Sequence, residues 1–293
     1  MKPQYIVGLG EALWDMLPQG RQIGGAPANF AYHVSRFGLP VRVVSAVGKD
    51  NLGKEILQAF SERKIPAMVS EVDQPTGTVQ VTLDDNGVPV YEICTGVAWD
   101  FIPFTPQLEA LGGQTCAVCF GSLAQRSDVS RETIHRFLDA MPSDEEVLKV
   151  FDINLRQQFY TSEILHTSLR KCNILKINDE ELAIVARLWN FEEKSQEEQA
   201  RRLLWDYGLK LVILTCGENG SYVFTPKCTS FERTPQVPVV DTVGAGDAFT
   251  AAFIASLLKG SSVIEAHRCA VRISAYVCTQ SGAMPEYDFA ALH

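Results

Sequence analysis

Six short apolar segments, separated by longer amphipathic stretches, limit the folds that this 293-residue chain can adopt. Near-continuous apolar runs of this length are typical of strands that are covered on both faces in a parallel sheet. Helical patterns lie between them, at residues 27–38, 51–63 and 195–208. This alternation predicts an α/β sandwich with helices on both faces of the sheet. The predicted strands are residues 5–10, 41–48, 116–122, 147–154, 173–178 and 211–217.

Residues 76–96 depart from this pattern, because two β-type runs there flank the turn Asp85-Asn86-Gly87. An Asn-Gly pair between alternating runs is a strong hairpin signal. A hairpin inserted between α/β units is not expected in the central sheet, so we interpret it as part of a small β lid. We predict one domain over residues 1–293, with a lid formed by approximately residues 12–23 and 76–98.

The composition argues against several classes of function. The chain has 35 acidic residues against 26 lysines and arginines, for a formal net charge of -9. Nucleic acids and membrane surfaces usually call for a basic patch, so neither is an expected partner. No secretory signal or membrane-spanning apolar run is visible in the sequence. The eight scattered cysteines are typical of reduced thiols, and we expect a cytoplasmic protein.

The glycine pair Gly24-Gly25 stands just before a predicted helix with Asn29 in its first turn. Glycine lets a ligand approach the backbone closely, and an asparagine side chain both donates and accepts hydrogen bonds. This combination suits a ligand that is rich in hydroxyl groups. A plain connection between a loop and a helix is the alternative, although it would not need both glycines.

The segment DTVGAGDAF, residues 241–249, places two acids around a glycine-rich turn. The backbone amides of Gly244, Ala245 and Gly246 can converge on one point, where the dipole of the following helix favours negative charge. These features predict an anion hole for a transferring phosphoryl group. Asp247 could serve there as a base, and the residues alone equally allow it to be a helix N-cap.

Polar residues also follow three of the predicted strands. In an open α/β sheet, ligands bind beyond the carboxyl ends of the strands, so we expect these residues to line one crevice. Each of them taken singly could instead cap the next helix. The residues are Asn154 and Arg156, Asn178 and Glu181, and Thr215 and Gly217.

Together, the Gly-Gly-x-x-x-Asn segment, Asn178-x-x-Glu181 and DTVGAGD resemble the ribokinase-like (PfkB) family of carbohydrate kinases, in order and in spacing. The resemblance spans essentially the whole chain and includes the closing turn SGAMP at residues 281–285. The segments GEALWDMLP (10–18), FGSLAQ (120–125) and FDINLR (151–156) are most similar to fructokinases.

The resemblance implies a ribokinase-like three-layer α/β/α sandwich with a β lid over the sugar. It also implies ATP-dependent phosphorylation of a sugar hydroxymethyl group, with fructose as the favoured substrate. A kinase for 2-keto-3-deoxygluconate, ribose or a nucleoside is the alternative within the family. A sugar or nucleotide sensor without catalytic activity is the alternative from another class.

Particular residues acquire roles through the same resemblance. Asp247 is the implied base, the backbone of Gly244, Ala245 and Gly246 the implied anion hole, and Arg156 an additional positive charge. The implied sugar-binding residues are Asp15, Gly24, Gly25 and Asn29. The implied nucleotide-binding residues are Asn178, Thr215, Gly217 and Gly220.

Two ions are implied as well. Asn178 and Glu181 would organise Mg²⁺ through water around the nucleotide phosphates. A K⁺ ion would be held by Asp241 and by backbone carbonyls, although the later of these positions depart from the ribokinase pattern. The carbonyls are those of Val243, Val277, Gln280 and Gly282. The expected partners are a sugar and ATP, and the lid could also pair across a homodimer.

Overall fold

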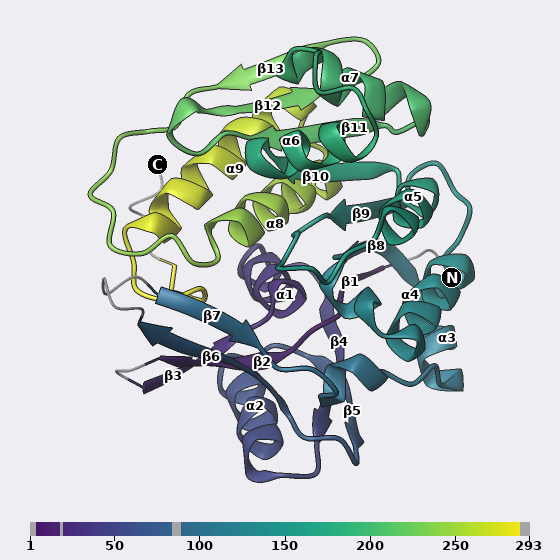
Figure 1. Cartoon of the computed structure of the whole chain (residues 1–293), viewed down its shortest axis with the longest axis vertical. Coiled ribbons are helices and arrows are strands. Elements are labelled where there is room, and N and C mark those ends of the chain that lie inside the picture. The colour runs from purple at the N-terminus through teal and green to yellow at the C-terminus, as the bar shows by residue number, and fades with distance from the viewer. Residues whose placement is uncertain (1–3, 18–19, 84–88, 288–293) are drawn as a thin grey trace.

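A nine-stranded sheet forms the centre of the computed structural model, which describes residues 4–17, 20–83 and 89–287 (Figure 1). The strands from β5 to β11 run parallel to their neighbours, and β12 and β13 are antiparallel additions at one edge. In sheet order the strands are β13 (Thr229–Glu232), β12 (Ser221–Phe224), β11 (Leu211–Thr215), β10 (Ile174–Asn178), β9 (Leu148–Asp152), β8 (Thr115–Phe120), β1 (Tyr5–Leu9), β4 (Val41–Gly48) and β5 (Ala67–Val72).

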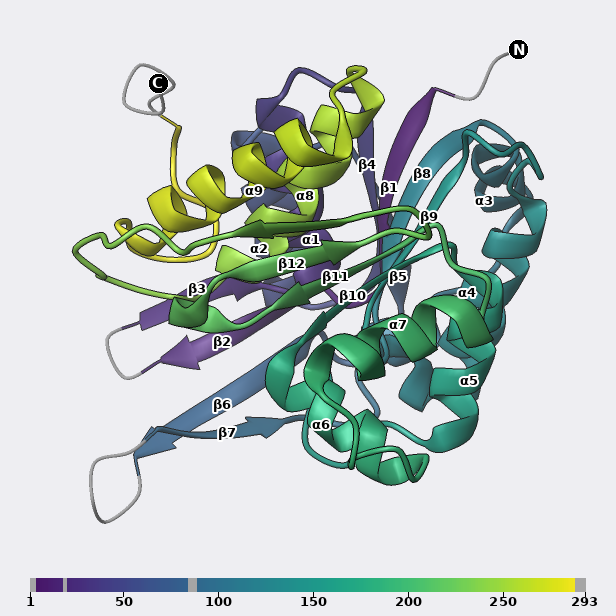
Figure 2. The same cartoon turned by 90° about the horizontal axis from the view of Figure 1, so that it is seen from above.

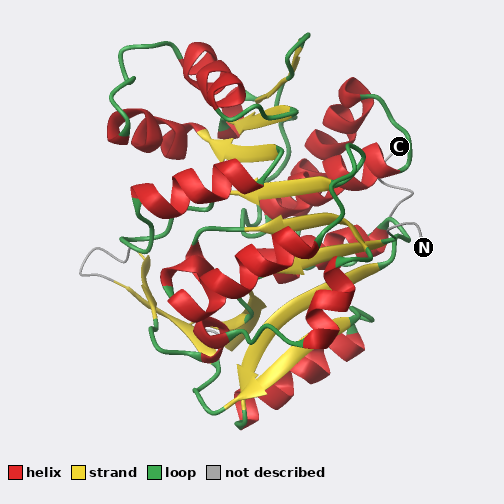
Figure 3. Ribbon diagram, turned by 90° about the vertical axis from the view of Figure 1, so that its right-hand side faces the viewer, coloured by secondary structure: helices red, strands yellow, loops and turns green. Residues whose placement is uncertain are grey.

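Helices cover both faces of this sheet, which confirms the predicted three-layer sandwich (Figures 2 and 3). One face carries α1 (Ala26–Arg36), α2 (Asn51–Glu62), α8 (Ala245–Leu258) and α9 (Val263–Cys278). The other face carries α3 (Pro106–Gly112), α4 (Asp128–Ala140), α5 (Ser162–Lys171), α6 (Asp179–Leu188) and α7 (Gln196–Asp206). Successive strand residues face opposite cores, as Val118 and Cys119 do in β8, and this explains why the strands read as continuous apolar runs.

The six predicted strands and three predicted helices are all present, and their ends agree with the prediction to within two residues. Three short 3₁₀ helices connect other elements: η1 (Ala98–Phe101), η2 (Leu123–Arg126) and η3 (Gly217–Asn219). Within the described residues, no helix combines the length and the apolar composition that crossing a membrane would require.

A second, four-stranded sheet projects beside α1 and α2 (Figures 1 and 2). It is built from β2 (Leu13–Leu17), β3 (Gly20–Gly24), β6 (Gly77–Leu83) and β7 (Pro89–Ile93), in the order β3-β2-β6-β7. Strands β6 and β7 pair antiparallel, as a hairpin requires. The predicted turn Asp85-Asn86-Gly87 lies outside the described residues. The role of this sheet as a lid stays a prediction.

A buried arginine ties the end of the small sheet to the large one. Arg126 donates to both carboxylate oxygens of Asp100, at 2.8 and 2.9 Å, and to the carbonyl of Cys94, just after β7, at 2.6 Å. The Arg126 and Asp100 side chains are only 7% and 4% exposed. The guanidinium also stacks on the rings of Trp99 and Phe159. Removing one member of such a pair would leave the other charge buried without a partner.

We therefore expect Arg126→Met to lower the free energy of unfolding by about 3–5 kcal/mol, as measured by urea denaturation. The matched control is Lys49→Met, which breaks an exposed pair with Asp73. That change is expected to cost less than about 1 kcal/mol. Equal losses in the two variants would show that the Arg126–Asp100 pair does not anchor the small sheet.

Candidate active site

The strand order of the large sheet reverses between β1 and β8, and the carboxyl ends of the parallel strands face a crevice there. The chain runs outward from β1 to β4 and β5 on one side, and from β8 to β11 on the other. Asn29 and Asp247 meet at this place although 218 positions separate them in the sequence. The side-chain amide of Asn29 donates to an Asp247 carboxylate oxygen at 2.8 Å.

The glycine pair allows the start of α1 to pass very close to the small sheet. Gly25 is the N-cap of α1 with φ of 112°, in the region that favours glycine. A Cβ on Gly25 would lie 2.3 Å from the Glu11 carbonyl oxygen, and one on Gly24 would lie 2.4 Å from a carboxylate oxygen of Asp15. Burial raises the pKa of Asp15 to about 6. All four predicted sugar-binding residues thus belong to β2, β3 and the start of α1.

The start of α8 has the geometry of an open N-terminus. Its N-cap is Gly244, with φ of 78°, and no side chain caps the helix there. Asp247 is the third residue of the helix, so it is not the N-cap that the sequence also allowed. The amide of Ala245 donates weakly to Thr242, at 3.3 Å. Among the described residues, no carbonyl accepts a hydrogen bond from the amides of Gly246 or Asp247, which leaves both free for a ligand.

The surroundings of Asp247 bring the pKa of its carboxyl group close to neutral pH. Burial is the largest effect and raises its pKa, and the nearby charge of Asp152 raises it further, to about 7. The hydrogen bond from Asn29 and the positive charges of Lys176 and Arg156 act in the opposite direction. The side chain keeps partial access to solvent. A carboxyl group with this pKa is suited to take up a proton at physiological pH.

Asn178 and Glu181 form a capping box at the start of α6, as their spacing also allowed. The Glu181 carboxylate accepts hydrogen bonds from the amides of Asn178 and Leu155, both at 3.0 Å, and its side chain is buried. It therefore joins the carboxyl ends of β9 and β10. No group of three or more His, Cys, Asp or Glu side chains in the described part of the chain could hold a metal ion. The role of this pair at a water-bound Mg²⁺ ion stays a prediction.

The predicted nucleotide residues follow β11 next to this capping box. Thr215, the last residue of β11, pairs in register with Asn178 of β10. Gly217 and Gly220 have φ angles of 53° and 102°, and a Cβ on Gly220 would lie 2.6 Å from the carbonyl oxygen of Glu232. Both glycines are thus required by the turn between β11 and β12. Their functional role stays a prediction.

Arg156 is exposed and folds back onto its own loop. It donates to the side chain of Asn154 at 2.7 Å and to the carbonyl of Leu155 at 3.2 Å. Its charge still contributes to lowering the pKa of Asp247. Arg156 is therefore near enough to act electrostatically on the crevice, and its guanidinium is accessible to a charged ligand.

Asp241 connects the loop before α8 with the turn after α9. Its carboxylate accepts from the amides of Val243 and Gly282, each at 3.0 Å. The carbonyl of Val277 accepts from the amide of Gln280 at 3.0 Å. Carboxylate and carbonyl oxygens are the ligands that hard cations prefer, and their role in holding a K⁺ ion here stays a prediction.

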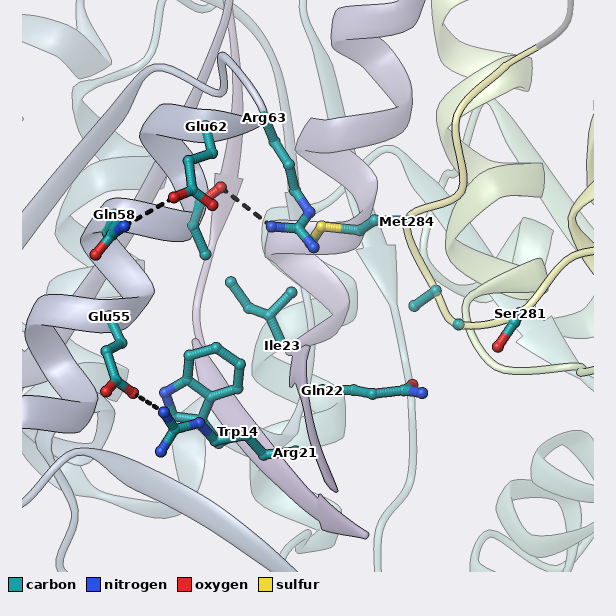
Figure 4. A pocket seen from close by; sticks show the side chains of 13 residues that line it. Trp14, Arg21, Gln22, Ile23, Glu55, Gln58, Glu62, Arg63, Ser281 and Met284 are labelled. Atoms are coloured by element: carbon teal, nitrogen blue, oxygen red, sulfur yellow. Dashed lines mark hydrogen bonds and ion pairs between the residues drawn. The ribbon is translucent and has the colours of Figure 1, made fainter. Parts of the chain in front are cut away.

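A cavity of about 590 Å³ lies on another side of the small sheet, between α2, β2–β3 and residues 281–284 (Figure 4). Among its charged groups, Arg21 pairs with Glu55, Glu62 accepts from the side chain of Gln58, and Arg63 donates to the carbonyl of Ala59. Neither Asn29 nor Asp247 lines this cavity. It is therefore separate from the place where Asn29 and Asp247 meet, although Gly282, one of the predicted K⁺ ligands, lines it.

Three buried charged residues near Asp247 were not identified from the sequence. Asp152 and Lys176 form an ion pair of 3.1 Å, and Glu11 is 4% exposed with a pKa that burial raises. A signal for two of them exists, because Asp152 and Lys176 interrupt the otherwise apolar runs VLKVFDIN and NILKIN. Charged residues are almost never fully buried unless they are paired.

Comparisons with known proteins agree with this geometry. Residues 19–288 match the family described as pfkB family carbohydrate kinase. A curated ATP-dependent 6-phosphofructokinase from Thermoanaerobacterium thermosaccharolyticum is 29% identical, and the alignment covers 98% of this chain and 92% of that protein. A fructokinase from Salmonella typhimurium is 30% identical, with 85% and 83% covered.

Solved structures confirm the predicted fold. A fructokinase from Vibrio cholerae O395, determined with fructose, ADP and a calcium ion, superposes with a TM-score of 0.82. The superposition covers 99% of this chain and 97% of that one, at 24% sequence identity. At this level of identity the likeness establishes the shared architecture.

The raised pKa of Asp247 predicts a pH-dependent stability difference. An acid whose pKa is raised on folding contributes stability below its unfolded value, about 4, and loses it as the pH rises through about 7. Asp247→Asn should therefore be increasingly more stable than the unmodified protein from pH 4 to pH 8, as measured by thermal unfolding. Asp128→Asn, which changes an exposed acid, is the matched control. A stability difference that does not grow with pH would contradict the assignment.

Proposed function

This chain belongs to the PfkB family of carbohydrate kinases, and from this premise we propose that it transfers the γ-phosphate of ATP to a hydroxymethyl group of a monosaccharide, with fructose as the favoured substrate. The observation that carries the proposal is the contact of 2.8 Å between Asn29 and Asp247, at the open N-terminus of α8. Relatives named fructokinase support the choice of sugar.

In the proposed reaction, a sugar hydroxyl oxygen attacks the γ-phosphorus of ATP. The new P–O bond forms while the bond to the β–γ bridging oxygen breaks, and ADP leaves with that electron pair. The hydroxyl proton moves to Asp247, whose pKa of about 7 suits this step. Phosphoryl transfer depends mainly on positioning and charge stabilisation, and both require a fixed site.

The first turn of α8 would stabilise the transferred group. The backbone amides of residues 244–246 are proposed to donate to its oxygens, with that of Ala245 first releasing its weak hydrogen bond to Thr242, and the helix dipole adds to their effect. Asp15, Gly24, Gly25 and Asn29 would hold the sugar hydroxyls, and Arg156 would neutralise further negative charge. The small sheet is proposed to close over the sugar as a lid, which excludes water from the reacting phosphate.

Thr215, Gly217 and Gly220 are proposed to bind the nucleotide, and Asn178 and Glu181 to organise Mg²⁺ through water. When bound, Mg²⁺ supplies charge neutralisation at the phosphates. The fructokinase of Xylella fastidiosa has a structure with bound ATP, and that of Vibrio cholerae has been solved with ADP and either calcium or potassium. The oxygens around Asp241 would take the K⁺ ion.

The proposal extends to location and assembly. A sugar kinase that consumes ATP is expected to act in the cytoplasm. In the described part of the chain, β3 and β7 are the edges of the small sheet, and two copies could join through such an edge. Sedimentation of the purified protein over a range of concentrations tests this homodimer.

A coupled ADP-release assay tests the proposed substrate across fructose, fructose 6-phosphate, ribose, 2-keto-3-deoxygluconate and adenosine. Fructose should give the highest kcat/KM, and Asp247→Ala should lower kcat by about 10²–10⁴-fold because the base is lost. Nucleotide binding, measured by calorimetry, should survive in that variant. A preference for another acceptor would change the substrate within the family, and ADP release from none of them would favour a sensor. Near-normal turnover of Asp247→Ala would remove Asp247 from the role of base.

Asn29→Ala should affect the sugar far more than the nucleotide. Loss of a hydrogen bond to a charged or strongly polar group costs about 1.5–3 kcal/mol, so KM for the sugar should rise by about tenfold or more. KM for ATP should change by less than about twofold. Asn51→Ala, at an exposed position at the start of α2, is the matched control. An equal rise in both KM values would move Asn29 out of the sugar site.

A further inference from the structure

A buried ion pair lies under the proposed anion hole and has no part in the reaction described so far. The ammonium of Lys176, in β10, lies 3.1 Å from a carboxylate oxygen of Asp152, at the end of β9. The two side chains are 7% and 4% exposed. Since the cost of removing both charges from water offsets most of their attraction, a buried pair is a weak source of stability. Its position at the carboxyl ends of the central strands calls for another explanation.

Asp152 is bonded directly to α8, in the second turn of the helix. Its second carboxylate oxygen accepts a hydrogen bond of 3.0 Å from the hydroxyl of Thr250. The same hydroxyl lies 3.1 Å from the carbonyl oxygen of Gly246, one turn earlier in the helix. The hydrogen bond between Thr250 and Asp152 is buried, so water does not compete for its donor and acceptor. The carboxylate therefore fixes the rotation and the height of the turn that carries Gly246 and Asp247.

Lys176 approaches the same turn from the sheet. A Cβ placed on Gly246 would lie 3.2 Å from the Lys176 ammonium nitrogen, which is closer than most Cβ contacts. Glycine at position 246 thus leaves the space that the ammonium group occupies. A positive charge at this distance from the backbone of an anion hole favours negative charge on the ligand.

We propose that Lys176 and Asp152 are a positioning pair for phosphoryl transfer, in which the ammonium supports the anion hole from the sheet side and the carboxylate holds the first turn of α8 in place. This inference rests on the proposed kinase function of the site. Neither residue needs to touch the sugar. Both act through Gly246 and Asp247.

The pair also acts electrostatically on Asp247, together with the other groups that face it. Asn29 approaches from α1, Asp152 from β9, Lys176 from β10 and Arg156 from the loop after β9. Cys119 of β8 is also within electrostatic range, and its thiol has a pKa raised by burial first and by Asp152 and Asp247 next. Glu11 adds a smaller negative contribution at Cys119.

Within this set, Asp152 and Lys176 act on Asp247 in opposite directions. The negative charge of Asp152 raises the pKa of Asp247, and the positive charge of Lys176 lowers it. Replacing each one separately should therefore shift the titration of Asp247 in opposite directions. An ion pair far from Asp247 would not produce this pattern.

The experiment uses Asp152→Asn, Lys176→Met and the double variant of the full chain. The ¹³C-carboxyl signal of Asp247, assigned by its loss in Asp247→Asn, is titrated by NMR in each protein. The midpoint should move to lower pH in Asp152→Asn and to higher pH in Lys176→Met, with the acidic limb of kcat/KM following it. Midpoints that do not move, or that move in the same direction, would overturn the electrostatic role.

The double variant tests positioning apart from charge. The losses of Asp152 and Lys176 change the pKa of Asp247 in opposite directions, so their electrostatic effects partly cancel in this variant. We expect kcat to fall by about tenfold or more, with KM for the sugar changed by less than about threefold. Removing both charges together also avoids leaving one of them buried alone, so this variant keeps the test available if Lys176→Met does not fold. Unchanged kcat in the folded double variant would overturn the positioning role.

The matched controls are Lys171→Met and Asp139→Asn, because these residues form an accessible Lys–Asp pair with a distance of 2.6 Å. They should leave both kcat and the Asp247 titration unchanged. The NMR titration does not depend on turnover. If the unmodified protein phosphorylated no sugar, the proposed function would fail, and the direction of the two midpoint shifts would still decide whether the pair controls Asp247.

Discussion

The first turn of α8 is held from several sides, and the rest of the site depends on this constraint. Residues 248–256 of α8 are all buried, because the helix packs between the sheet, α1 and α9. Gly244 lies against Ala283, where an added Cβ would approach to 2.7 Å. Asn29 contacts Asp247 from α1, and Asp152 contacts Thr250 from β9. An N-terminus fixed in this way can present free amides to a ligand without rearranging, which is what electrostatic stabilisation of a transition state requires.

Several charged side chains are buried together in one crevice. Their burial costs folding free energy and also shifts the pKa values of the carboxyl groups. Asp152, Asp247 and Glu181 share the field of a single buried ammonium group, that of Lys176. The Glu181 carboxylate is stabilised by hydrogen bonds from two backbone amides. The Asp152 carboxylate is stabilised by the ammonium of Lys176 and the hydroxyl of Thr250. Asp247 has only Asn29 as a direct side-chain partner among the described residues. Burial, and after it the charge of Asp152, raise its pKa to about 7.

The sequence predicted the central strands well because burial on both faces produces continuous apolar runs. It did not identify β5, β12 or β13, whose positions at or near the sheet edges leave polar and exposed residues in the pattern, as in AMVSEV. In the site, the glycine motifs could be predicted because their backbone requirements exclude other residues. The sequence could not predict whether Asp247 caps the helix, because this depends on where the helix begins. The helix begins after Gly244, which takes the left-handed conformation and is the N-cap. Lys176 and Asp152 were missed because the sequence shows a charge in each apolar run but not the register of β9 and β10 that brings the two side chains together.

The proposed chemistry and the proposed choice of sugar lie on different parts of the fold. Asp247 and residues 244–246 belong to α8 on the large sheet, whereas Asp15 and Gly24 belong to the small sheet. The two sheets are joined by local contacts, such as Arg126 with Asp100 and the Trp14 indole with the carbonyl of Leu52. Asn29 connects both parts, because it lies in the first turn of α1, the helix that follows β3, and its side chain donates to Asp247. If the proposed roles hold, substitutions in β2 or β3 would alter which hydroxyl groups are accepted, while the base and the anion hole would keep their geometry.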